Sequence, residues 1–181
     1  MTKVNKTLKK AIELIDTEYT HVLEFGVYSG GTLTQLRNDL PDKYQTFGFD
    51  SWEGLPEDWV GTRHKKGGLC ANMPRIENTK LYKGWFTDTI PVYKEIAKPI
   101  ALLHCDADLY SSTITILYEL NQYIVPGTII VFDEWYYNHK DVEENRQHEQ
   151  KAFYEWVSDM GREYILYDEV EDERKIVKIV K

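Results

Sequence analysis

Compact apolar runs and segments with helical spacing alternate along the chain. Such runs are typical of buried strands, and they predict strands at residues 21–28, 44–50, 79–86, 100–108 and 127–134. Apolar residues three or four positions apart predict helices at residues 30–40, 89–98, 111–124 and 144–160. The same spacing predicts an N-terminal docking helix within residues 1–19, through Val4, Leu8, Ala11, Ile12 and Ile15.

The C-terminal part of the pattern differs from the rest. Residues 163–170 and 174–180 are apolar runs on either side of a charged turn, which predicts an antiparallel hairpin. In the helix before them, the predicted inward-facing residues are Phe153, Trp156, Val157 and Met160. Five strand–helix units and a hairpin predict an α/β fold with a mainly parallel, doubly wound sheet in a single domain over residues 1–181. Such a sheet binds ligands beyond the carboxyl ends of its strands.

Composition narrows the classes of function. The 181 residues are 42% hydrophobic, which provides a core, and carry 22 Lys and Arg against 30 Asp and Glu, a net charge of −8. A net-acidic chain is a poor partner for nucleic acid or for an anionic membrane surface. Two cysteines make no disulfide framework, and we find no signal peptide and no apolar run that could span a bilayer. We therefore expect a cytoplasmic protein.

The first predicted strand ends in a glycine-containing turn, from Glu24 to Thr32. Glycine lets the backbone approach a ligand closely, although the spacing is neither a dinucleotide fingerprint nor a P-loop, and a tight turn without a ligand remains an alternative. Asp50 ends the second strand, 24 residues after Gly26. A carboxylate there can accept both hydroxyls of a ribose, or it can cap the next turn. The two features together favour a nucleoside ligand.

Four carboxylates follow the fourth and fifth predicted strands, namely Asp106, Asp108, Asp133 and Glu134. Neighbouring strands would bring them to one edge of the sheet, where they repel one another unless a cation lies between them. Oxygen ligands alone suit Mg²⁺, Mn²⁺ or Ca²⁺ rather than zinc. The alternative is that some of these acids, Asp108 and Asp133 among them, cap the following helices.

Other residues allow two interpretations each. We expect His104 to be a packed core histidine, and His139 to be a loop residue or a rival catalytic base. His64 lies in a basic segment, residues 63–66, which is either a solvated patch or part of a cover that attracts an anionic substrate. The aromatic residues Trp135, Tyr136 and Tyr137 could form a sugar-stacking wall or pack within a loop. The acidic run at residues 141–149 reads as a solvated helix face.

Five strings carry a resemblance to a known family. They are Glu24-Phe25-Gly26-Val27-Tyr28-Ser29-Gly30, the stretch from Gly48 to Pro56, Lys83-Gly84-Trp85-Phe86, the stretch from Asp106 to Thr113, and Phe132-Asp133-Glu134. In this order, over about residues 20–135, the chain resembles the macrocin O-methyltransferases, S-adenosylmethionine enzymes that methylate sugar hydroxyls of antibiotics. The resemblance implies the seven-stranded class I methyltransferase sheet, whose last strand is antiparallel.

The resemblance also implies roles for single residues. The cofactor-binding residues would be Glu24, Gly26, Ser29 and Thr32 near the methionine, Asp50, Ser51 and Trp52 near the ribose, and Gly84, Trp85 and Phe86 near the adenine, with Tyr28 and Asp106 also in contact. Asp106, Asp133 and Glu134 would hold the metal; the family usually has Asp at the position of Glu134. Asp108 would be the base, with Asp106 as a further catalytic residue.

The sequence thus predicts an O-methyltransferase that acts on a hydroxyl of a sugar or another small natural product. Its cofactors would be S-adenosyl-L-methionine and Mg²⁺ or another hard divalent cation. The alternatives are a cofactor-binding module without catalysis and a nucleotide-sugar-binding α/β enzyme. The acceptor would be held by the long irregular segment at residues 51–75, by the loop after the fifth strand, or by a second subunit, so a homodimer stays open.

Overall fold

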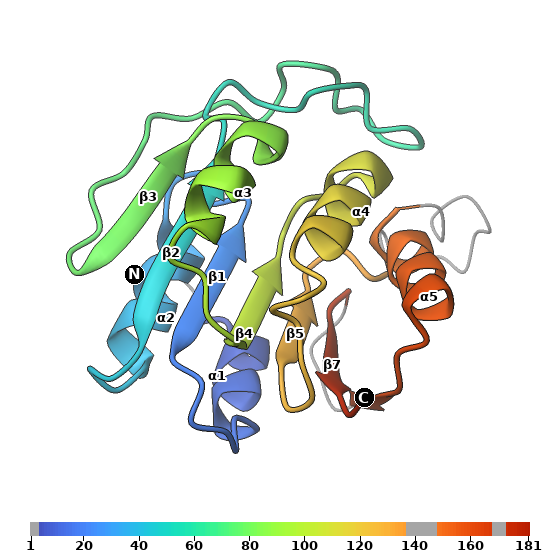
Figure 1. Ribbon diagram of the computed structural model, residues 1–181. Coiled ribbons are helices and arrows are strands. Elements are labelled where there is room, and N and C mark those ends of the chain that lie inside the picture. Colours follow the sequence, from blue (N-terminus) through green and yellow to red (C-terminus); the bar gives the residue numbers. More distant parts are fainter. Residues whose placement is uncertain (1–3, 137–147, 168–172) are drawn as a thin grey trace.

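Seven strands form one mixed sheet in the order β3-β2-β1-β4-β5-β7-β6. The computed structural model describes residues 4–136, 148–167 and 173–181 (Figure 1). The strands are β1 (His21–Phe25), β2 (Gln45–Asp50), β3 (Thr79–Lys83), β4 (Ile100–Cys105), β5 (Ile129–Phe132), β6 (Tyr164–Tyr167) and β7 (Lys175–Ile179). The first five run parallel, and β7 is antiparallel to both β5 and β6. This is the class I methyltransferase sheet, so the predicted fold class is confirmed.

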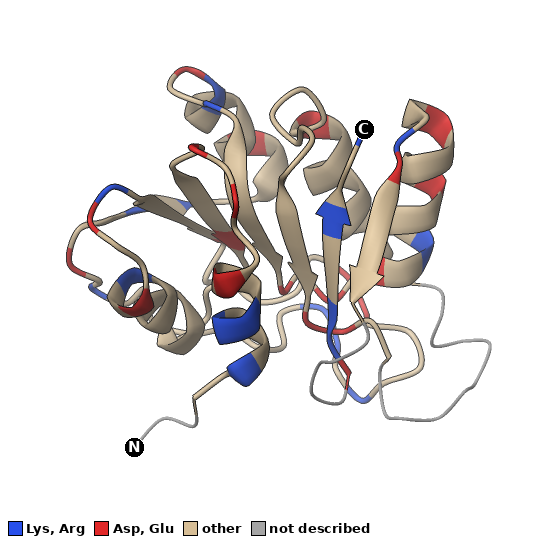
Figure 2. Cartoon of the chain, turned by 90° about the horizontal axis from the view of Figure 1, so that it is seen from below, with Lys and Arg blue, Asp and Glu red and all other residues tan. Residues whose placement is uncertain are grey.

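In the described ranges, five helices cover the two faces of the sheet. They are α1 (Lys6–Glu13), α2 (Gly31–Asp39), α3 (Phe86–Lys94), α4 (Tyr110–Glu119) and α5 (Glu149–Met160). Figures 1 and 2 show α1 and α2 on one face, with α3, α4 and α5 on the other. The predicted docking helix is therefore present, and α1 packs against β5, β7 and α2.

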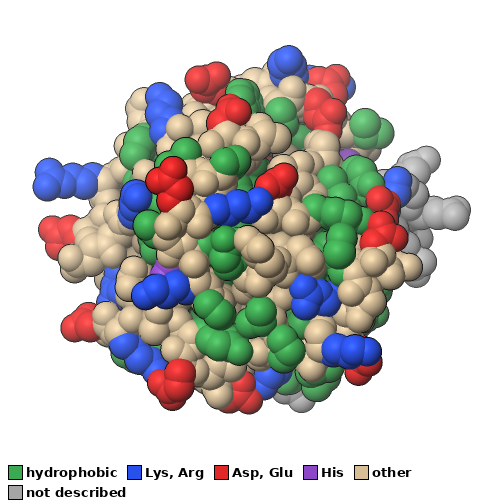
Figure 3. All heavy atoms as spheres, viewed as in Figure 1, with side chains coloured by type: hydrophobic (Ala, Val, Ile, Leu, Met, Phe, Trp, Pro, Cys, Tyr) green, Lys and Arg blue, Asp and Glu red, His purple; other side chains and the backbone are tan. Residues whose placement is uncertain are grey.

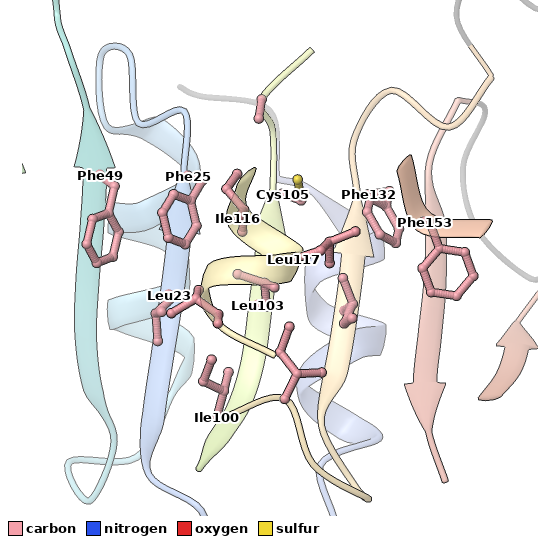
Figure 4. Packing of buried hydrophobic residues seen from close by; sticks show 14 of the residues in the cluster. Leu23, Phe25, Phe49, Ile100, Leu103, Cys105, Ile116, Leu117, Phe132 and Phe153 are labelled. Carbon is pink, nitrogen blue, oxygen red and sulfur yellow. The ribbon is translucent and has the colours of Figure 1, made fainter. Parts of the chain in front are cut away.

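Strand alternation explains the two layers of core. Successive residues of β1 are all buried, because both faces of the strand are covered by helices. Leu23 and Phe25 pack with Phe49 and Phe132 on the face of α3, α4 and α5 (Figure 4), whereas Val22 packs on the opposite face. The rings of Phe25 and Phe49 stack with centroids 4.3 Å apart. The continuous apolar runs of the sequence are thus the central strands.

The predicted strands extend beyond the observed strand ends, and one residue predicted to face inward is exposed. Residues 84–86 were expected to extend the third strand, but Gly84 has φ +143° and Phe86 already begins α3. The backbone turns there because glycine alone tolerates this conformation without strain. In α5, Phe153 and Trp156 are buried as predicted, whereas Met160 is 37% exposed in the last turn. Met160 continues the helical spacing of the buried residues, but no neighbouring element in the described part of the chain covers it at the end of α5.

The segment at residues 51–75, called here the 51–75 loop, contains no helix or strand, as predicted. It nevertheless has its own backbone hydrogen bonds. Leu55 N–H donates to the Gly68 carbonyl at 2.8 Å, and Gly67 N–H donates to the Leu55 carbonyl at 2.9 Å. The loop therefore doubles back on itself, and it passes along the edge of the sheet where the parallel strands end (Figure 1).

The surface shows no dominant charge on the face covered by α3, α4 and α5. Basic and acidic side chains are interspersed there (Figure 3). Within the described ranges, no helix is both long and apolar enough to cross a membrane. Cys70 is exposed and Cys105 is buried, and neither forms a disulfide.

Candidate active site

A cavity of about 810 Å³ opens at the carboxyl ends of the parallel strands. Several parts of the chain contribute to it: the turn after β1, the 51–75 loop that follows β2, the start of α3, the residues after β4 and β5, and the first turns of α4. Its lining includes Gly26, Tyr28, Asp50, Ser51, Trp85, Phe86, Asp106, Asp108, Asp133 and Glu134. Most of the residues that the sequence singled out thus meet in one place, because parallel strands end on the same side of a sheet.

The turn after β1 is built around Gly26. This residue has φ +89°, and a Cβ added to it would lie 1.7 Å from the carbonyl oxygen of Asp106. The backbones after β1 and β4 are held together at this point, where Asp106 N–H donates to the Phe25 carbonyl at 2.9 Å. Only glycine fits, and the open turn leaves room for a ligand beside it.

Asp50 has a structural role and also faces the cavity. Its Oδ1 accepts from Trp52 N–H and its Oδ2 accepts from Tyr28 N–H, both at 2.7 Å. The first bond caps the following turn, so the alternative interpretation of Asp50 holds in part. Tyr28 and Trp52 both have positive φ, and Trp52 Nε1 donates to the Tyr28 carbonyl at 2.9 Å. Each carboxylate oxygen keeps a second lone pair, which a hydroxyl of a ligand can use.

The other predicted cofactor residues divide into lining and supporting groups. Tyr28, Ser29 and Thr32 line an adjoining cavity of about 480 Å³ together with Gly26 and Asp106. Trp85 and Phe86 line the larger cavity, whereas Gly84 supports it through its N–H, which donates to the Asp50 carbonyl at 3.0 Å. Trp52 is buried against the core on the side of α1 and α2 and lines neither cavity.

Buried charged groups form a chain behind the cavity. Thr32 Oγ1 donates to Glu24 Oε1 at 2.9 Å, and Glu24 Oε2 lies 2.9 Å from His104 Nδ1. His104 Nε2 lies 3.3 Å from Asp133 Oδ1, and Arg174 donates to both oxygens of Asp133, at 2.6 and 3.1 Å. His104 is buried as predicted, but it joins two carboxylates instead of packing only among apolar groups.

The contacts of His104 fix its charge. Burial alone would lower the pKa of His104, but its hydrogen bonds to Asp133 and Glu24 raise that pKa well above the ordinary value. Burial likewise opposes ionisation of Asp133, yet His104 and Arg174 lower the pKa of Asp133 to about 2. At neutral pH the chain therefore contains an imidazolium and an ionised Asp133.

The remaining carboxylates lack such partners. Burial and then the charge of Asp133 raise the pKa of Asp108 to about 7, and the same two causes raise the pKa of Glu134 to about 8. The pKa of Asp106 is also raised well above its ordinary range, first by burial and then by Asp133. Among the described residues, no hydrogen bond or ion pair reaches Glu134 Oε2, which is buried. These three acids face the cavity, and none of them forms an ion pair with another described residue.

The helix-capping alternative for Asp108 and Asp133 is not what the structure shows. Helix α4 begins after Leu109, without a side-chain cap, although Asp108 precedes it. Asp108 instead has φ +60° and lines the cavity. Asp133 is engaged by Arg174 and His104.

Sequence reasoning missed two residues of this region. Glu149, assigned to a solvated acidic face, is fully buried and accepts from Ala107 N–H at 3.2 Å and from Glu134 N–H at 3.0 Å. The sequence pattern predicts Arg174 only as the first residue of the second strand in the C-terminal hairpin. Nothing in the sequence pattern marked Glu149, and the pairing of Arg174 with Asp133 depends on the register between β5 and β7 in the folded sheet.

The 51–75 loop is anchored over the cavity. Leu55 and Trp59 pack on Leu109, and Ser111 Oγ donates to Glu57 Oε1 at 2.5 Å. His64 stacks beside Trp59 at 5.8 Å between ring centroids, and it lines the cavity with Lys66. His64 is thus part of the cavity wall, not only of a solvated patch.

The two described aromatic residues after β5, Trp135 and Tyr136, do not form a shared wall. Trp135 is buried and packs against Phe132 and Phe153, which supports the packing interpretation for this residue. Tyr136 is 43% exposed, with Lys175 over its ring. Tyr137 and His139 lie outside the described residues, as does the acidic run up to residue 147.

A metal could be bound by part of this cluster. Within the described part of the chain, one group brings ligand atoms within 4.8 Å of one another, formed by His104, Asp106 and Asp133. His104 is poorly suited as a ligand, because both of its nitrogens face carboxylates and carry protons. Glu134, expected as the third ligand, is outside that group but lines the same cavity.

Part of the chain is similar in sequence to known O-methyltransferases. Residues 75–160 match the model of the family described as Macrocin-O-methyltransferase (TylF). A Streptomyces olivaceus protein named 8-demethyl-8-(2,3-dimethoxy-alpha-L-rhamnosyl)-tetracenomycin-C 4'-O-methyltransferase is 27% identical over 138 residues, which are 63% of this chain and 52% of that protein. The chain therefore spans about half the length of this curated relative.

Solved structures show the same fold. The calicheamicin methyltransferase CalS11 superimposes with a TM-score of 0.77 at 18% identity, over 96% of this chain and 77% of that chain. The O-methyltransferase NovP gives a TM-score of 0.74 at 19% identity, over 97% of this chain and 80% of that chain.

Proposed function

We propose that the chain is an S-adenosylmethionine-dependent O-methyltransferase of the macrocin O-methyltransferase type, whose family model matches residues 75–160. The observation that carries the proposal is a single cavity in which a glycine turn, Asp50 and a cluster of unpaired acids meet. The acceptor would be a hydroxyl of a sugar or another small natural product. The names of two similar proteins support this class, since one is a 4'-O-methyltransferase of a rhamnosyl-tetracenomycin and the other, CalS11, is a TDP-rhamnose 3'-O-methyltransferase.

The cofactor fits the residues at the strand ends. The carboxylate of Asp50 would accept the ribose hydroxyls, while Trp85 and Phe86 would flank the adenine. Ser29 and Thr32 would contact the methionine, with Glu24 holding Thr32 in place through a 2.9 Å hydrogen bond. Gly26 leaves the space that a Cβ would fill. When bound, S-adenosylmethionine supplies an electrophilic methyl group on its sulfonium.

Asp108 is the proposed base. It lies in the cavity, and its pKa of about 7 lets it accept the proton of the acceptor hydroxyl near neutral pH. Asp106, which lines both cavities, would position the reacting groups. The 51–75 loop covers this end of the cavity and would exclude water from it.

A divalent cation also fits the oxygen donors. Asp106, Asp133 and Glu134 would hold it, and the buried, unpartnered Oε2 of Glu134 is a donor atom that a cation would satisfy. When bound, a hard cation lowers the pKa of an alcohol and orients it.

The two unpaired cysteines agree with the cytoplasmic location that we expect.

Cofactor binding is tested with Asp50→Asn. Loss of the carboxylate should weaken binding of S-adenosylhomocysteine by about 10- to 100-fold, because hydrogen bonds to a charged group are lost. Isothermal titration calorimetry measures this, with Asp42→Asn as the matched control at an exposed position. Absence of binding by the unmodified protein would refute the proposed cofactor.

The base is tested separately, with an acceptor found by a methyl-transfer screen. Asp108→Asn should lower kcat by about 100-fold or more, because the acceptor proton then has no acceptor group. Calorimetry should show that the variant still binds S-adenosylhomocysteine. Unchanged turnover in this variant would exclude Asp108 as the base.

A further inference from the structure

Arg174 holds one of the proposed metal ligands. Its Nε lies 2.6 Å from Asp133 Oδ1, and its second guanidinium nitrogen lies 3.1 Å from Asp133 Oδ2. Both carboxylate oxygens are therefore engaged by one planar fork, the strongest geometry available to an arginine–carboxylate pair. The Arg174 side chain is partly buried, at 28% exposure, and Asp133 is at 12%, which strengthens the pair relative to one in water.

The sheet register imposes this pairing. Strand β7 runs antiparallel to β5, with Lys175 opposite Phe132. Continuing the register by one position places Arg174 opposite Asp133. The adjoining backbone is also fixed, because Tyr136 N–H donates to the Glu173 carbonyl at 2.9 Å. The backbone register therefore places the Arg174 guanidinium beside Asp133.

The other carboxylates of the cluster have no such cation. Between described residues, no ion pair reaches Asp106, Asp108 or Glu134, although all three line the cavity with Asp133. Of the three proposed metal ligands, only Asp133 forms ion pairs between described residues, with Arg174 and His104, although the Arg174 charge also acts on Asp106 and Glu134. A cation that binds Asp133 must share its oxygens with a permanently charged guanidinium, and the two positive charges repel.

We propose that Arg174 is an internal counter-cation that competes with the divalent metal for Asp133. Without metal, the guanidinium neutralises Asp133 and keeps the acid cluster in place. With metal, it gives up at least one of its two hydrogen bonds. Arg174 thereby sets the metal concentration at which the site fills. This inference rests on the metal site of the proposed function.

The test measures binding of Mn²⁺ alone, by calorimetry and by the electron paramagnetic resonance signal of free Mn²⁺. Arg174→Met removes the charge and should tighten Mn²⁺ binding by at least about tenfold. Arg174→Lys keeps a charge but not the planar fork, so its affinity should lie between those of Arg174→Met and the unmodified protein. Arg75→Met removes the same charge from an exposed side chain and should leave the affinity unchanged.

Thermal unfolding gives a second measure. In metal-free buffer, Arg174→Met should unfold at a lower temperature than the unmodified protein, and Mn²⁺ should stabilise the variant more. The proposal is overturned if folded Arg174→Met binds Mn²⁺ no more tightly than the unmodified protein, or if neither binds it. S-adenosylhomocysteine binding, measured on each variant, separates these results from a failure of the methyltransferase assignment.

Discussion

At Gly26 two stretches of backbone lie so close that a single methyl group has no space. The positive φ of this residue adds a second reason for glycine, but the contact with the Asp106 carbonyl is the stronger one, because backbone cannot move aside as a side chain can. The same contact fixes Asp106 relative to the turn after β1, so packing at this residue also sets the shape of the site.

Gly26→Ala should therefore lower the free energy of unfolding by more than about 3 kcal/mol, through the steric clash and the backbone strain together. Gly61→Ala is the matched control, since Gly61 has φ +83° and open space where a Cβ would lie. It should cost only about 1 kcal/mol, from strain alone. Urea unfolding measures both; equal losses would show that the contact with Asp106 does not matter.

At the scale of the element, Glu149 ties α5 to the site. One carboxylate accepts N–H groups from the residues after β4 and after β5, so the first turn of α5 holds two strand ends together. In our proposal the Glu149 side chain does not contact the methyl acceptor. It nevertheless positions the backbone of both Ala107 and Glu134.

Glu149→Gln should lower the free energy of unfolding by about 1–3 kcal/mol, because an amide offers one acceptor oxygen to two buried donors. Glu13→Gln, at an exposed position with only a 3.8 Å contact to Lys10, should change it by less than about 0.5 kcal/mol. Guanidinium unfolding of both variants provides the comparison. A Glu149→Gln protein as stable as the control would argue against the anchoring role.

The elements also show what a sequence can predict. Central strands such as β4 were predictable because both faces are covered, which demands an unbroken apolar run. Asp50 and Asp106 were predictable as neighbours because parallel strands end together. Glu149 and Arg174 were not, because their partners lie up to 42 residues away in the chain and depend on the register of the folded sheet.

At the scale of the whole molecule, acid should destabilise the fold through a histidine far from the acid cluster in sequence. His21 is buried at the start of β1, where Nδ1 lies 2.8 Å from the Tyr93 hydroxyl. Burial, together with the charge of Lys98, lowers the pKa of His21 from 6.5 to about 4. Between these two values the unfolded chain binds a proton that the folded protein does not, so stability falls as the pH falls.

From pH 7 to pH 5, the unmodified protein should therefore lose about 1–2 kcal/mol more of its unfolding free energy than His21→Gln, which has no titrating ring. Urea unfolding of both proteins at the two pH values measures the difference. The other titrating groups are present in both proteins, so their contributions to the pH dependence of the unfolding free energy cancel in this comparison. Parallel pH profiles would show that His21 is not the source.

The position of β7 has a consequence for how the protein is made. This strand follows every other strand of the sheet along the chain, yet it lies between β5 and β6 and carries Arg174 to Asp133 in its register. A ribosome that has released the chain only as far as β6 has produced all the acids of the cluster without the arginine that balances one of them. The nascent sheet has a gap beside β5, and its carboxylates repel one another. Synthesis of the final sheet strand therefore closes the sheet and neutralises Asp133 in the same step.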